Sequence, residues 1–123
     1  ELTIGKGEQL TEGTEVAIIS IGAIATEVEK KIAASSTPAR YAHYDMIFLK
    51  PLDENLLHHI FTTYKAVITV EEGSTGGLGS AIAEFSAAHQ YSIPLKTIHL
   101  PDTFISQDIS FSEATSFCLE SLL

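Results

Sequence analysis

The stretch Ala66-Val-Ile-Thr-Val-Glu-Glu-Gly-Ser-Thr-Gly-Gly-Leu-Gly-Ser-Ala-Ile-Ala-Glu-Phe85 identifies the fold class of this chain more directly than any other segment. It begins as a short apolar run with β-branched residues, continues through two acidic residues and a glycine-rich turn, and resumes with helical spacing. This is the pattern of a strand, a tight loop and a helix, the unit from which parallel α/β sheets are built. Ligands and partners meet such sheets at the carboxyl ends of the strands, where this loop lies.

The apolar pattern alternates between strand and helix along the rest of the chain. We expect strands at 16–21, 44–49, 66–70 and 95–99, and helices from Ile24 to about Pro38, after an N-cap at Asp53, at 78–89 and from Ser110. Residues 2–10 read as an edge strand. Strands and helices joined by short connections predict right-handed crossovers and a mostly parallel sheet between two helical layers.

Each expected helix has one apolar face. The inward residues are Ile24, Val28 and Ile32 in the first helix; Leu56, Leu57, Ile60, Phe61 and Tyr64 in the second; Leu78, Ile82 and Phe85 in the third; and Phe111, Ala114, Cys118 and Leu122 in the last. On the outer face of the first helix, Glu27 and Lys31 are spaced to pair.

Length and composition indicate one globular domain. The chain has 123 residues, of which 45% are hydrophobic, and no apolar run approaches the ~18 residues that a membrane span needs. It begins at Glu1 rather than methionine, so we expect residues 1–123 to be a fragment of a larger chain.

The charge balance argues against a nucleic-acid partner. Seven basic residues against 16 acidic ones give a net charge of −9, and no basic stripe interrupts the acidic surface. Cys118 is the only cysteine, which excludes an internal disulfide and a thiolate metal cluster, and fits a reducing cytoplasmic location.

The glycine-rich loop is the candidate contact for a partner or an anion. Its candidate residues are Glu72, Gly73, Gly76, Gly77, Gly79 and Ser80. The loop lacks the Lys-Ser/Thr pair of a P-loop and the spacing of the dinucleotide fingerprint, and the neighbouring acids oppose a phosphate. The alternative is that the glycines allow positive φ and close packing of the helix on the sheet.

Other candidate groups do not form a recognisable centre. Glu71 and Glu72 are neighbours on a strand and point to opposite faces, so one of them is better placed to cap the following loop amides than to share a substrate. His58 and His59 diverge on their helix and, with Asn55 and Thr62, mark its solvent face. His43, His89 and His99 have no metal spacing, and no nucleophile motif occurs. We therefore predict no catalytic, cofactor-binding or metal-binding residue in this chain.

Several blocks, taken in order, resemble one family. They are Gly5-Lys-Gly-Glu8 with Val16-Ala-Ile-Ile-Ser-Ile-Gly22, Asp45-Met46 with Lys50-Pro-Leu-Asp53, Thr69-Val-Glu-Glu72 with Gly76-Gly-Leu-Gly-Ser80, and Leu100-Pro-Asp102 with Phe104-Ile105. Together they resemble the C-terminal domain of 1-deoxy-D-xylulose-5-phosphate synthase, a transketolase-like enzyme, over residues 5–107. The sequence departs from the family at Ile47, where an arginine is common, and at Asp108, where a glycine is usual.

The resemblance implies a three-layer α/β/α domain whose five-stranded sheet is mostly parallel, with one antiparallel edge strand formed by residues 2–10. It implies a parent transferase that joins pyruvate to glyceraldehyde 3-phosphate with loss of carbon dioxide, a step in isoprenoid precursor synthesis. Thiamine diphosphate and magnesium would be bound by other domains, since the Gly-Asp-Gly…Asn motif is absent here. This domain would be non-catalytic and would contact those domains and a second subunit of a homodimer.

Three alternatives remain open. The β subunit of 2-oxo-acid dehydrogenases shares the Pro-Leu-Asp and Val-Glu-Glu-Gly pieces, and transketolase is a more distant relative. In either case the loop from Gly73 to Ser80 would act as a module that binds a partner or an anion. The third alternative is a free-standing small α/β enzyme, which needs an acid or histidine cluster that forms only in three dimensions.

Overall fold

The computed structural model describes residues 5–47, 50–72 and 77–100, and the fold is stated for these residues. The elements are, in chain order, β1 (Glu8–Thr11), β2 (Val16–Ser20), α1 (Ile24–Ala34), a 3₁₀ turn η1 (Pro38–Arg40), β3 (Tyr41–Asp45), α2 (Glu54–Thr63), β4 (Ala66–Glu72), α3 (Leu78–Ala88) and β5 (Leu95–Leu100). No helix in this part of the chain has the length and apolar character required to cross a membrane.

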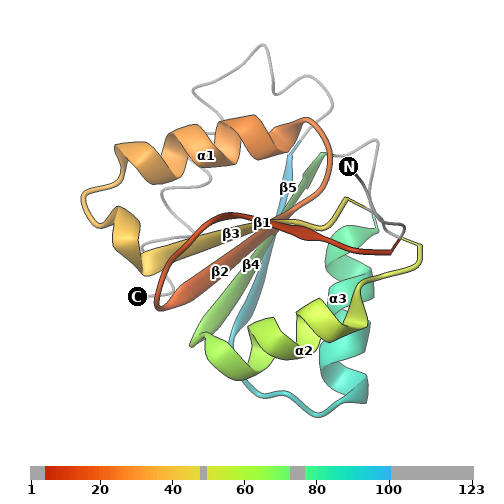
Figure 1. Ribbon diagram of the computed structural model, residues 1–123. Coiled ribbons are helices and arrows are strands. Elements are labelled where there is room, and N and C mark those ends of the chain that lie inside the picture. Colours follow the sequence, from red (N-terminus) through yellow and green to blue (C-terminus); the bar gives the residue numbers. More distant parts are fainter. Residues whose placement is uncertain (1–4, 48–49, 73–76, 101–123) are drawn as a thin grey trace.

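The five strands form one sheet in the order β1-β3-β2-β4-β5. Every neighbouring pair is parallel except β1 with β3, which is antiparallel at one edge. Helix α1 covers one face of the sheet, and α2 and α3 cover the other (Figure 1). The predicted three-layer fold with a mostly parallel sheet and an antiparallel edge strand is confirmed.

The two faces of the sheet carry separate apolar cores. The core under α1 comprises Val16, Ile18, Ile24, Val28, Ile32, Tyr41, Ala66, Ile68, Val70 and Ile98. The core under α2 and α3 comprises Ala17, Ile19, Ala42, Tyr44, Met46, Leu57, Ile60, Phe61, Tyr64, Val67, Leu78, Ile82 and Phe85. Because both faces are covered, all five residues of β2 are buried, which explains why this strand shows no polar alternation.

A tyrosine pair provides the polar contact inside the second core. The hydroxyls of Tyr44 and Tyr64 lie 2.8 Å apart, and the rings meet edge to face. Burial, helped by this hydrogen bond, raises the pKa of Tyr44 well above its ordinary value of 10. The Tyr44 hydroxyl therefore stays protonated, and the two tyrosines share one hydrogen bond inside the core.

The predicted helices and their inward faces are confirmed for α1, α2 and α3. Ile24, Val28 and Ile32 are buried in α1. The Asp53 carboxylate accepts from the backbone N–H of Leu56 at 3.1 Å, so the predicted N-cap of α2 is also confirmed. The expected helix after Ser110 lies outside the described residues.

Some local predictions were wrong. The second central strand is β3, at Tyr41–Asp45 rather than 44–49, because η1 ends at Arg40 and the chain extends at once. It stops before Ile47, whose φ of 65° is incompatible with a strand. On α1, Glu27 pairs with Lys30, at 3.6 Å, and not with Lys31.

The edge strands also differ in extent from the prediction. The antiparallel strand β1 covers Glu8–Thr11, later than the expected 2–10, of which residues 2–4 lie outside the described part of the chain. A register shift between Gln9 and Thr11 marks a bulge in its pairing with β3. Strand β4 runs two residues beyond Val70, so that Glu71 and Glu72 are its last residues, at the carboxyl end of the strand.

Candidate functional site

The candidate loop lies at the point where the strand connections diverge. After β2 the chain passes through α1 to β3 on one side, and after β4 it passes through α3 to β5 on the other side. In an open α/β sheet this switch point, at the carboxyl ends of the strands, is where ligands usually bind. The topology therefore supports the choice of this loop as a candidate site.

The structure describes part of the predicted loop. Gly77 is the N-cap of α3, and Gly79 and Ser80 lie in its first turn. Glu72 is the last residue of β4. Gly73 and Gly76 lie outside the described residues, so the candidate site as a whole stays a prediction.

The N-terminus of α3 already holds a carboxylate from the same chain. Glu71, which is 2% exposed, accepts hydrogen bonds from the backbone N–H of Leu78 and of Gly79, each at 2.9 Å. These are the free N–H groups that a helix N-terminus presents to an anion. The expectation that one of the two glutamates caps the following amides is confirmed for Glu71, which occupies the position a bound anion would take.

The two described glycines have structural roles. Gly77 has φ 115° and ψ −20°, a conformation that side chains with a Cβ rarely adopt. A Cβ on Gly79 would lie 2.6 Å from Cγ2 of Thr97 on β5 and 3.0 Å from the Glu71 carboxylate. The glycines therefore provide a left-handed turn and a close approach of α3 to the sheet, as the alternative interpretation expected.

A buried serine, a buried histidine and a partly exposed glutamate meet between α1 and the sheet. The Nε2 of His43 on β3 lies 2.7 Å from Oγ of Ser20 on β2, and its Nδ1 lies 2.5 Å from Oε2 of Glu29 on α1. Thr11 on β1 completes the network, with its hydroxyl 2.6 and 2.7 Å from the two Glu29 oxygens. The network therefore joins four elements of the fold.

The hydrogen bonds of this network have a defined direction. The Glu29 carboxylate can only accept, so Nδ1–H of His43 donates to it. Burial lowers the pKa of His43 below its ordinary value of 6.5, outweighing the opposing hydrogen bond and charge of Glu29 and the charge of Asp45. The ring is therefore neutral at pH 7, and its Nε2 accepts a hydrogen bond from the Ser20 hydroxyl.

The connectivity matches that of a Ser-His-acid triad, but the site is closed. In hydrolases the serine bonds one ring nitrogen and the acid bonds the other, as here. Ser20 and His43 are both 0% exposed, beneath α1. A substrate cannot reach the Ser20 hydroxyl in this arrangement, so the network holds the fold together and does not supply a nucleophile.

Reading the sequence missed this network because Ser20, Glu29 and His43 are 9 and 14 positions apart and lie on three different elements. No local motif joins them. The available signal was a polar residue in each of two neighbouring buried strands, Ser20 in β2 and His43 in β3. Strand alternation places both on the face that packs against α1.

His58 also differs from its prediction. It is half-buried and not fully solvated, with its ring 4.8 Å from Phe85 and 4.5 Å from His89, and its Nδ1 2.5 Å from the Tyr91 hydroxyl. His59 is exposed as expected. Within the described ranges, no group of three or more His, Cys, Asp or Glu side chains could hold a metal ion.

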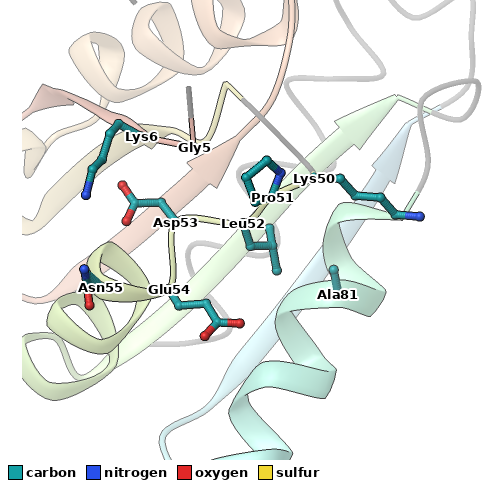
Figure 2. Close-up of a pocket in the computed structure, with 9 residues that line it drawn as sticks. All are labelled: Gly5, Lys6, Lys50, Pro51, Leu52, Asp53, Glu54, Asn55 and Ala81. Atoms are coloured by element: carbon teal, nitrogen blue, oxygen red, sulfur yellow. The ribbon is translucent and has the colours of Figure 1, made fainter. Parts of the chain in front are cut away.

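An open pocket of about 680 Å³ lies beside the N-terminus of α2, among residues that follow the carboxyl end of β3 (Figure 2). It is lined by Gly5, Lys6, Lys50, Pro51, Leu52, Asp53, Glu54, Asn55 and Ala81. The Asp53 carboxylate, besides capping α2, accepts from the backbone N–H of Gly7 at 2.9 Å. Reading the sequence did not identify this pocket, because its walls come from three separate segments.

We expect Glu71→Gln to lower the free energy of unfolding by about 1–3 kcal/mol, because an amide replaces a charged acceptor of two buried N–H groups. Denaturant titration at pH 7 measures the change. The matched control is Glu84→Gln, on the exposed side of α3, which should change stability by less than about 0.5 kcal/mol. Equal effects of the two variants would contradict the assigned cap.

Gly77→Val should destabilise the chain by about 1 kcal/mol or more, since valine is strained at positive φ. Ser80→Val, three residues later in right-handed helix, is the control, and should cost about 0.5 kcal/mol or less. Thermal unfolding of both variants tests this. An unchanged melting temperature for Gly77→Val would show that the turn does not need glycine.

The His43 network predicts a loss of stability in mild acid. The pKa of His43 is lower in the folded chain than its unfolded value of 6.5, so the unfolded chain binds the proton first. The stabilisation is complete above pH 6.5 and declines as the pH falls toward the folded pKa, by at most about 1.4 kcal/mol per pH unit. Denaturant titrations from pH 8 to pH 5 should show this slope in the unmodified chain and in His59→Gln, but not in His43→Gln. A slope that persists in His43→Gln would rule out His43 as its source.

Comparison with known proteins agrees with this architecture. Residues 5–114 match the family model described as "Transketolase, C-terminal domain". The chain is 47% identical over 121 residues to a protein of Phocaeicola vulgatus named 1-deoxy-D-xylulose-5-phosphate synthase, covering 96% of this chain and 19% of that protein. It is 47% identical over 119 residues to the Parabacteroides distasonis protein of the same name, covering 95% of this chain and 19% of that one.

A solved structure titled "Split gene transketolase, inactive beta4 tetramer" superposes with a TM-score of 0.71 at 32% identity, covering 84% of this chain and 34% of that one. The chain spans about a fifth of the length of the two synthases from Phocaeicola vulgatus and Parabacteroides distasonis. The predicted resemblance to the C-terminal domain of 1-deoxy-D-xylulose-5-phosphate synthase is confirmed. The chain belongs to the family of transketolase C-terminal domains.

Proposed function

We propose that this chain is the non-catalytic C-terminal domain of a thiamine-diphosphate-dependent transferase resembling 1-deoxy-D-xylulose-5-phosphate synthase. The parent enzyme would convert pyruvate and glyceraldehyde 3-phosphate to 1-deoxy-D-xylulose 5-phosphate and carbon dioxide. Thiamine diphosphate and magnesium would be bound by domains outside this chain. This domain would give the parent structural support and a surface for assembly.

One observation carries the non-catalytic assignment. At the strand–helix turn where an α/β sheet usually binds a ligand, the N–H groups of Leu78 and Gly79 are taken by Glu71. A diphosphate at this turn would have to displace a buried carboxylate and would be repelled by its charge. The turn is therefore suited to structural support and not to a cofactor.

The proposed partners are the other domains of the parent chain and a second subunit in a homodimer. A cytoplasmic location, with no nucleic-acid or membrane partner, fits the net charge of −9. The solved structural neighbour is titled a tetramer of β chains, which supports assembly of chains that carry this domain. The oligomeric state of the parent follows from its molar mass in solution.

A second candidate function is a partner-binding module, as in a transketolase or a 2-oxo-acid dehydrogenase β subunit. The observation that favours it is the exposure of Gly77 and Ser80 beside the switch point, which leaves these two residues open to contact. The anion form of this proposal is weaker, because Glu71 occupies the helix amides. Amide shifts of Gly77 and Gly79 on addition of inorganic phosphate would separate the two forms.

The free-standing enzyme is the weakest alternative. The cluster that it requires does form, from Ser20, His43 and Glu29, but its serine and histidine are fully buried. A reactive-serine probe that labels Ser20 in the folded chain would revive it.

Calorimetric titration of thiamine diphosphate with Mg²⁺ into the 123-residue chain should give no saturable heat, because the residues that bind the cofactor would lie upstream. The positive control is the full-length parent, which should bind the cofactor and make 1-deoxy-D-xylulose 5-phosphate. Micromolar binding to this chain alone would overturn the non-catalytic assignment. A full-length parent that binds no thiamine diphosphate would overturn the proposed function.

A further inference from the structure

We draw no further inference here: the strongest candidate, the cluster of His58, Phe61, Phe85, His89 and Tyr91 between α2 and the C-terminal end of α3, carries none because its rings pack against one another, the described residues add no third metal ligand to its two histidines, and nothing in the structure shows what covers it.

Discussion

The contact between the Glu71 carboxylate and the first turn of α3 is the constraint on which the candidate site depends. It joins the end of the central strand β4 to the helix that follows, through hydrogen bonds to Leu78 and Gly79. Gly79 permits this geometry because any larger residue would meet Thr97 on β5. An α/β sheet normally leaves these amides free for a ligand. In this domain the two amides bind Glu71 of the same chain. The sheet topology is therefore that of a ligand-binding protein, but the usual anion site is occupied by a side chain.

A second polar contact, partly buried, secures the opposite face of the sheet. Glu29 on α1 accepts from Thr11 on the edge strand and from His43 on β3, which in turn accepts from Ser20 on β2. Strand β1 is short, exposed and bulged, so its pairing with β3 alone gives it little support. The carboxylate of α1 adds a fixed side-chain contact across the edge. The glutamate of a triad-like arrangement thus also holds the edge strand β1, through Thr11.

The sequence predicted the features that depend on local pattern. The buried stripe of α1 and the Asp53 cap follow from spacing and side-chain chemistry within one turn of helix, and both are present. The start of β3 was misplaced because its pairing with β2, not its own residues, decides where it begins. Ile47 adopts a left-handed conformation, and a hydrogen bond from its N–H to the Asp45 side chain holds it there. This conformation could not be predicted from the sequence, because β-branched residues rarely adopt it. The contacts of His43 with Ser20 and Glu29 form only when three elements pack together, so the spacing of these residues along the chain does not predict them.

The distribution of apolar residues limits how this domain can associate with other domains. Covering a five-stranded sheet on both faces consumes the large hydrophobic side chains in two cores, and Leu10 is the exception among the described residues. A surface of that kind offers little area for hydrophobic association, and a net charge of −9 opposes contact with another acidic surface. In the parent chain that we propose, covalent linkage would offset this weakness, because a tethered domain needs only modest contact energy to stay docked. The fold is therefore better suited to a place within a longer chain than to free association in solution.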